Sequence, residues 1–403
     1  MKRPLHIFSA LFTLLAGVVW MQSAAAIPAF ARETGKQCSY CHTAWPQLNA
    51  KGRQFKEQGY RLANQLNEDI NLLDLIETFP IAGAVVSRPE DKKDNGDSKL
   101  RALHELEIWL AGPIGKRFSG FAEFEAEDED GFGAVAAHGN AAYHFNRYLN
   151  VRAGFQNIFW DDPYGLLNIT FNMTGPIRPA FLDNSFGGGE SKLRKSRQMV
   201  SLYGRLFNDK LFYSLAYADN AEDLEGEDPR TYMGRAAFDI TKDIHIGGFY
   251  MEGSQGSVKN PAALTIAAGL PAVTPASTTP GTDYQRYGVD AQLDYKQFRL
   301  QGVYMHAQDD LNDGTGNKDN DFFTLQSMYT FTNKNGSPTW VPLIRYDRFE
   351  QKDGKNDFDE LTAQLNYYIS ENSKIFAQFW TQLNTPAGDE KNDRFTLQFQ
   401  IAF

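Results

Sequence analysis

The sequence predicts an all-β fold, a transmembrane antiparallel β-barrel of about 16 strands with a small N-terminal α-helical domain. Three observations predict it. The chain begins with a secretory signal pattern, a single Cys-x-x-Cys-His motif follows, and the rest is a series of segments of about ten residues in which apolar and polar residues alternate. A hydrophobic content of 42% suits such a barrel, because only half of each strand has to be apolar.

Residues 1–26 have the pattern of a signal peptide. Lys2 and Arg3 form a basic head, Leu5 to Trp20 is mostly apolar, and three alanines immediately before Ile27 supply a cleavage site. The apolar stretch is too short for a membrane-spanning helix and has the wrong flanks. We therefore expect the mature chain to be exported.

Residues 27–78 are predicted to form a c-type cytochrome domain around Cys38, Cys41 and His42. Two thiols at this spacing can each bond one vinyl group of a porphyrin, and the imidazole that follows is close enough to ligate the iron. The chain has only two cysteines, both in this motif, and no second Cys/His pair lies nearby to complete a zinc site. A redox-active disulfide is the alternative. The prediction is one covalently bound c-type haem, attached at Cys38 and Cys41, with His42 as an axial ligand of the iron.

The remainder of this domain is expected to be mostly helical. Pro46 suits the first turn of a helix, and Gly52 and Gly59 mark turns or close backbone approaches. A segment of this size makes a thin core, so the haem or an enclosing body has to supply further apolar surface.

Residues 79–403 are predicted to form an outer-membrane, porin-like barrel. The expected strands are 79–88, 100–111, 118–127, 132–145, 148–158, 197–207, 210–219, 230–240, 244–253, 284–295, 298–308, 321–331, 339–350, 357–369, 374–384 and 393–403. Phe118, Ala122 and Phe124 fall on one face of their strand, with Glu123 and Glu125 on the other. A soluble β-sandwich would alternate as well, but it explains neither so many strands after a signal peptide nor a last strand that ends in phenylalanine.

The connections between these strands alternate in length. Short turns of such barrels lie in the periplasm and long loops lie outside, which places the haem domain and the C-terminus on the periplasmic side. The long link 159–196 is expected to fold inward as a constriction loop, and 261–281, rich in proline, alanine and threonine, is expected to be a flexible external loop.

The acidic residues are concentrated in the expected outer loops, and the net charge is −10. An acidic outer opening of the barrel, which we call the acidic mouth, either attracts a metal-ion substrate or is a solvated surface that divalent ions bridge to lipopolysaccharide. The charge disfavours nucleic acid as a partner. The crowded positions are Glu127, Asp128, Glu129, Asp130, Asp219, Glu222, Asp223, Glu225, Glu227, Asp228, Asp309, Asp310, Asp313, Asp319 and Asp321.

The second axial ligand of the haem is not apparent near the motif. No methionine occurs between residues 27 and 172, so a second ligand has to come from the barrel or from an inward loop, unless the position is open. His104 shares the apolar, outward parity of its strand. His138 and His144 have the parity of the lumen, and Met173 lies in the inward loop.

Several N-terminal segments resemble the outer-membrane monohaem cytochrome–porin fusions that act as iron(II) oxidases in iron-oxidising bacteria. The resemblance in motifs is confined to the first part of the mature chain, and the barrel is similar in architecture. The segments are Pro28–Gly35, Cys38–His42, Pro46–Asn49, Gly52, Phe55–Lys56, Gly59–Tyr60 and Phe79–Pro89.

This resemblance implies an iron(II):cytochrome c oxidoreductase that oxidises extracellular Fe(II) and passes the electron through its haem to a periplasmic carrier such as a soluble cytochrome c. Because Fe(III) is insoluble at neutral pH, oxidation outside the cell avoids deposits within it. The barrel would insulate the haem from the lipid membrane. Two alternatives remain: a diffusion porin plugged by its haem domain, and a conduit that exports electrons to an external acceptor.

Overall fold

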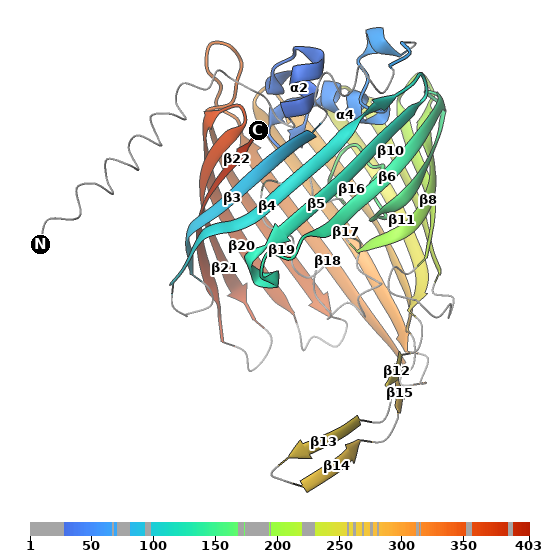
Figure 1. The fold of residues 1–403 in the computed structure, drawn as a ribbon, viewed down its shortest axis with the longest axis vertical. Helices are drawn as coiled ribbons and strands as arrows, with labels where there is room; N and C mark the ends of the chain where they lie inside the picture. The colour runs from blue at the N-terminus through green and yellow to red at the C-terminus, as the bar shows by residue number, and fades with distance from the viewer. Residues whose placement is uncertain are drawn as a thin grey trace, which may run out of the picture.

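Sixteen strands among the described residues close into one antiparallel barrel, and short helices lie at one of its ends (Figure 1). The computed structural model describes residues 28–66, 68–70, 81–92, 98–167, 173, 193, 195–219, 230–255, 258–260, 263–267, 270–274, 277–279, 282–311, 314, 316–351, 357–385 and 390–403. None of the helices in these ranges is both long and apolar enough to cross a membrane.

The barrel strands follow the chain order, and β22 pairs with β3 to close the ring, with Ile401 opposite Val85. All the predicted strands are confirmed, with ends displaced by a few residues. They are β3 (Ile81–Lys92), β4 (Ser98–Ile114), β5 (Phe118–Glu127), β6 (Val135–Asn146), β7 (Leu149–Asn157), β8 (Ser196–Leu206), β9 (Leu211–Asp219), β10 (Arg230–Thr241), β11 (Ile244–Gln255), β16 (Thr282–Tyr295), β17 (Phe298–Leu311), β18 (Gly316–Tyr329), β19 (Trp340–Gln351), β20 (Phe358–Ser370), β21 (Ser373–Asn384) and β22 (Asp393–Ala402).

Side chains alternate between the outside of the barrel and the lumen, as the period of two predicts. On β5, Phe118 and Phe124 are exposed on the outer face, whereas Phe121 and Glu123 are buried within. Aromatic pairs such as Trp340 with Tyr367 lie on the outer face, in keeping with the aromatic girdles of membrane barrels.

The two ends of the barrel differ. One end has the tight turns and the C-terminus, where Phe403 and Gly83 exchange backbone hydrogen bonds of 2.9 and 3.0 Å. We call it the short-turn end, and the opposite one the long-loop end. From the long-loop end a hairpin projects, made of β12 (Val258–Asn260) with β15 (Ser277–Thr279) and β13 (Ala263–Ala267) with β14 (Leu270–Thr274) (Figure 1). The described part of the expected external loop 261–281 thus contains paired strands.

The N-terminal domain lies at the short-turn end, beside the C-terminus (Figure 1). It comprises α2 (Pro28–Thr34), α3 (Cys38–Cys41), a small hairpin of β1 (His42–Ala44) and β2 (Gln47–Leu48), α4 (Ala50–Glu57) and the 3-10 turn η1 (Ala63–Gln65). Pro46 lies in the turn between β1 and β2 rather than at a helix start. The helix begins at Ala50 because the Asn49 side chain caps it.

The lumen at the long-loop half contains an apolar cluster. Residues 158–167 follow β7 inward, which confirms the expected constriction for the described part of 159–196; 168–172, 174–192 and 194 lie outside the described residues. The buried side chains of this lumen cluster include Ile158, Phe159, Leu166, Leu167, Leu193, Met199, Met233, Met251, Met305, Phe322 and Phe349.

Two buried ion pairs secure the inward segment to the barrel wall. Asp161 lies 2.8 Å from the Arg152 guanidinium, and Asp162 lies 3.4 Å from that of Arg235. These pairs and the apolar cluster hold the inward segment against the lumen wall.

Candidate functional site

The Cys-x-x-Cys-His motif folds as one short helix followed by a strand residue. Cys38 and Cys41 lie one turn apart on α3, both as thiols, and Cys38 is buried. Burial raises the pKa of the Cys41 thiol to about 11. Both sulfurs therefore project from the same short helix, as attachment of a single porphyrin requires.

The His42 ring is prepared to act as a metal ligand. Its Nδ1 lies 3.1 Å from the Pro46 carbonyl oxygen, and since a carbonyl only accepts, Nδ1 carries the hydrogen. The lone pair is then on Nε2, the arrangement that a backbone partner gives to metal-binding histidines. Burial lowers the pKa of His42 to about 4, against an opposing effect of backbone hydrogen bonds, so the ring is neutral at pH 7.

Helix α4 supports the motif from one side. Asn49 accepts hydrogen bonds from the Lys51 and Gly52 backbone amides and donates to the Ser39 and Tyr40 carbonyls at 3.3 and 3.1 Å. One side chain thus caps α4 and binds the free carbonyls of α3.

The two helices meet at Gly52. A Cβ atom on this residue would lie 2.1 Å from the Cys41 carbonyl oxygen, so only glycine permits the approach. This confirms the expected close approach at that position.

The barrel wall holds the other side of α3. Glu371, in the turn between β20 and β21, accepts the Cys38 backbone amide at 2.7 Å and the Ser39 hydroxyl at 3.2 Å. The Ser337 hydroxyl donates to the same carboxylate at 2.5 Å. A carboxylate at the first amides of α3 also complements the positive end of the helix.

Further anchors surround the domain. Arg299 of β17 donates to the Gln47 side chain at 2.7 Å and to the Thr43 hydroxyl at 3.2 Å. On another part of the wall, Arg205 of β8 binds both carboxylate oxygens of Glu57 at 2.6 and 2.8 Å. Because these contacts come from separate strands, the domain is fixed within the barrel end rather than tethered beside it.

The surroundings of the motif are apolar and suit a porphyrin. One buried cluster joins the domain to the barrel lumen, and we call it the motif cluster. Its large members are Cys38, Trp45, Phe55, Tyr60, Trp109, Phe121, Trp160, Met173, Met328, Leu343 and Tyr368. Two thiols, a neutral imidazole and an apolar enclosure are the donor set and environment that a c-type haem needs.

The structure places the candidate second ligands in different surroundings. Met173 is 4% exposed and belongs to the motif cluster. His138 and His144 lie among inward-facing side chains, as predicted. The His138 ring contacts the Trp160 ring at a tilted angle with centroids 4.8 Å apart, and His144 lies 2.8 Å from the Ser119 hydroxyl.

The prediction that His104 faces outward is wrong. The pairing of β3 with β4 shifts register between Val86 and Arg88, which adds residues to β4 and reverses the parity at His104. His104 is buried, and its Nδ1 lies 2.8 Å from Asp128.

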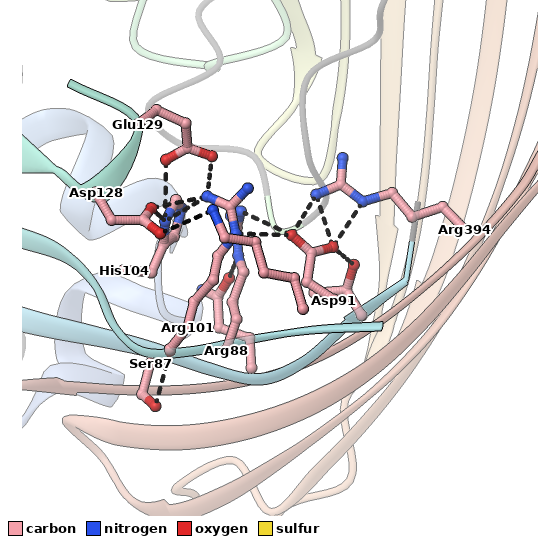
Figure 2. Close-up of polar contacts among 11 residues, drawn as sticks. Ser87, Arg88, Asp91, Arg101, His104, Asp128, Glu129 and Arg394 are labelled. Carbon is pink, nitrogen blue, oxygen red and sulfur yellow. Dashed lines mark hydrogen bonds and ion pairs between the residues drawn. The ribbon is translucent and has the colours of Figure 1, made fainter. Parts of the chain in front are cut away.

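Figure 2 shows how the acidic residues near His104 are neutralised. Asp128 and Glu129 both contact Arg101, while Asp91 binds Arg394 through two hydrogen bonds of 3.0 Å. Similarly, Asp309 pairs with Arg286 at 2.7 Å. For the described residues, much of the predicted acidic mouth is thus a set of ion pairs.

The other predicted acidic positions at the mouth divide between described and undescribed residues. Asp321 contacts His306 at 2.9 Å, so this carboxylate also has a basic partner. The other described positions are Glu127, Asp130, Asp219, Asp310 and Asp319, of which Glu127 belongs to the glutamate group below. Residues 222–228 and 313 lie outside the described residues.

A different acidic feature, which the sequence analysis did not assemble, lies on the lumen wall. Glu105 and Glu107 of β4 face Glu127 and Glu125 of β5 as direct cross-strand partners, and Glu123 lies opposite Trp109. Carboxylate oxygens of Glu105, Glu125 and Glu127 all lie within 4.8 Å of one another. The inward parity of the five glutamates was visible in the sequence, but the register that aligns the two strands was not.

Comparison with known proteins identifies the barrel. No family model matches the sequence, and no curated protein matches it. Among solved structures, the anion-selective porin from Comamonas acidovorans is similar, with 15% identity, a TM-score of 0.60, and coverage of 80% of this chain and 98% of the porin. OmpTdeltaL8, an outer membrane protein of Vibrio cholerae, has 12% identity, a TM-score of 0.58 and coverage of 80% and 98%. Salmonella typhi OmpF, in a complex with daunomycin, has 15% identity, a TM-score of 0.55 and coverage of 80% and 97%. The chain therefore has the fold of the 16-strand outer-membrane porins.

Proposed function

We propose that this protein is an outer-membrane c-type cytochrome–porin that oxidises extracellular Fe(II) and delivers the electron to a periplasmic acceptor. The observation that carries the proposal is the arrangement of Cys38, Cys41 and His42. Two thiols lie on one helical turn, and a neutral imidazole follows with its lone pair on Nε2. When bound, the haem supplies the one-electron chemistry of its iron.

The position of the motif supports electron transfer across the membrane. In porin-type barrels the short turns face the periplasm, so the domain would present the haem edge to a soluble carrier there. The lumen cluster in the other half brings buried apolar side chains of the inward segment against the barrel wall. Apolar side chains in the lumen suit the passage of electrons better than the passage of polar solutes.

The glutamates on β4 and β5 support a cationic substrate. Glu105, Glu125 and Glu127 bring three carboxylates within 4.8 Å of one another. Carboxylates are hard oxygen ligands that bind iron ions, and they stabilise Fe(III) relative to Fe(II), which favours loss of the electron. Fe(II) would reach them from the long-loop end.

The proposal is tested first by haem staining of the denatured purified protein in a gel. Covalent stain is expected in the wild type and should be absent after Cys38→Ala with Cys41→Ala. Stain that washes out of the denatured wild type would refute the covalent site.

The second test mixes the ferric holo-protein anaerobically with Fe(II) and follows haem absorbance. Reduction is expected, and the triple substitution Glu105→Gln, Glu125→Gln and Glu127→Gln should slow it, more at low salt than at high salt. Reduction by a neutral small reductant is the control and should not change. If wild-type haem stays oxidised in excess Fe(II), the iron-oxidase function is refuted and export of electrons becomes the better account.

A diffusion porin is the second candidate, and the fold itself favours it, because the solved structures similar to this chain include porins. The two functions differ in conductance, which the lumen cluster predicts to be small.

A further inference from the structure

We propose that Met173 supplies the second axial ligand of the haem iron through its thioether sulfur. The inference rests on the proposed haem at Cys38 and Cys41 and concerns the face of the haem opposite His42. Methionine with histidine is one of the ligand pairs of c-type haem.

The histidines of the described residues other than His42 all have partners elsewhere. The two ring nitrogens of His144 lie 2.8 and 3.0 Å from Ser119 and Asn150. The remaining four are His138 with Ser196 at 3.2 Å and Glu123 at 3.7 Å, His104 with Asp128 at 2.8 Å, His245 with Asp290 at 3.5 Å, and His306 with Asp321 at 2.9 Å.

The methionines divide between the two buried clusters. The sequence has eight, of which Met1 and Met21 precede residue 27. Of the remaining six, only Met173 and Met328 belong to the motif cluster together with Cys38. The other four, at 199, 233, 251 and 305, are in the lumen cluster.

A row of paired residues on the barrel wall connects the motif with Met173. Arg299, Met328, Leu343 and Gln364 are successive cross-strand partners on β17 to β20, and they form one row along the wall. At one end of the row, Arg299 donates to Thr43, the residue after His42.

The other end of the row holds the backbone of Met173. The side-chain amide of Gln364 donates to the Met173 carbonyl at 2.9 Å. The Gln364 amide is itself held, since it also donates to the Asn366 side chain at 2.8 Å. Met173 is thus held by its backbone while its thioether remains in the motif cluster.

The place in the chain separates Met173 from Met328. Residues 28–66 contain no methionine and no histidine other than His42, so a second ligand has to come from the barrel or its loops. Met173 lies in the chain between β7 and β8 and is held through its backbone by Gln364, whereas Met328 is part of the wall on β18 beside Arg299. A thioether ligand also raises the reduction potential, which helps the haem to accept electrons from Fe(II).

The test compares holo-proteins carrying Met173→Ala, Met173→His, Met328→Ala and, as a matched buried methionine in the lumen cluster, Met199→Ala. The readouts are covalent haem stain, the red-edge charge-transfer band that sulfur ligation gives to ferric haem, and the reduction potential. Wild type, Met328→Ala and Met199→Ala should show the band, and Met173→Ala should lose it while keeping its covalent stain. Met173→His should restore low-spin haem without the band.

The substitution Met173→Ala should also shift the electron equilibrium with a redox partner at least about tenfold toward oxidised haem, which corresponds to about 59 mV for one electron. Retention of the band in Met173→Ala, or its loss in Met328→Ala alone, would overturn the assignment. Wild-type protein with covalent haem but no sulfur band would overturn it while leaving the proposed function intact, and absence of covalent haem would overturn both.

Discussion

At Gly52 a single hydrogen atom in place of a side chain allows α3 and α4 to meet. The Cβ of an alanine would lie 2.1 Å from the Cys41 carbonyl and 2.9 Å from the Leu48 side chain, so one helix has to move. We expect Gly52→Ala to destabilise the domain by about 1–3 kcal/mol, the usual cost of overpacking. Thermal loss of haem absorbance measures this.

The matched control is Gly139→Ala, because a Cβ on Gly139 meets nothing within 4 Å. Gly139→Ala should melt like the wild type. Equal melting temperatures for Gly52→Ala and Gly139→Ala would show that the approach of the two helices is not tight.

The carboxyl group of Glu33 predicts that the stability of the domain depends on pH. Burial raises the pKa of this carboxyl to about 7, and the positive charge of Arg61 only partly opposes the shift. The folded state therefore binds more protons than the unfolded state between about pH 4.5 and 7, and stability falls as pH rises through this window. Since Glu33 is partly exposed, the loss should be on the order of 1 kcal/mol.

Glu33→Gln should remove this loss. The substituted holo-protein is expected to melt higher than the wild type at pH 7.5 and at the same temperature at pH 4. The exposed Glu68→Gln serves as the control and should melt like the wild type at both. A wild type more stable at pH 7.5 than at pH 5, with Glu33→Gln showing the same difference, would contradict the assignment.

Helix α3 is a single turn, and as an element it depends on the barrel for its N-terminal cap. Glu371 binds the Cys38 amide and the Ser39 hydroxyl, which are contacts that an isolated turn cannot make for itself. Glu371→Ala should cost about 2 kcal/mol, the contribution of hydrogen bonds to a charged group. Amide hydrogen exchange of a peptide covering 38–42 should become faster in the holo-protein.

Glu371→Gln keeps one acceptor oxygen and should give an intermediate exchange rate. Unchanged exchange in Glu371→Ala would mean that the covalent haem alone holds α3 in place.

At the scale of the whole molecule, the domain lies at the short-turn end (Figure 1) and the lumen cluster lies in the other half. We expect the holo-protein in planar bilayers to conduct far less than an open porin measured under the same conditions. Deleting residues 28–66 should raise the conductance, because it removes Lys56, which donates to the Trp160 and Asp162 carbonyls of the inward segment at 2.5 and 3.0 Å.

A conductance equal to that of the open porin from the intact holo-protein would favour the diffusion-porin function. Equally low conductance before and after the deletion would show that the lumen cluster restricts the barrel without Lys56.

The sequence by itself determined the features that depend on neighbouring residues. The covalent chain sets the spacing of Cys38, Cys41 and His42, and the geometry of a single strand sets the period-two alternation. Both the motif and the sixteen strands could therefore be predicted. The inward fold of 158–167 was also predictable, from its apolar residues.

Only the tertiary structure decided which distant side chains meet. Glu371 reaches Cys38 across 333 positions of the chain, and Met173 joins the same cluster because Gln364 holds its backbone. Near His104, the register between β3 and β4 shifts, and His104 is buried although the alternation in the sequence had placed it on the outer face. The physical reason is that barrel closure fixes the register between all strands together, and no local pattern specifies that register.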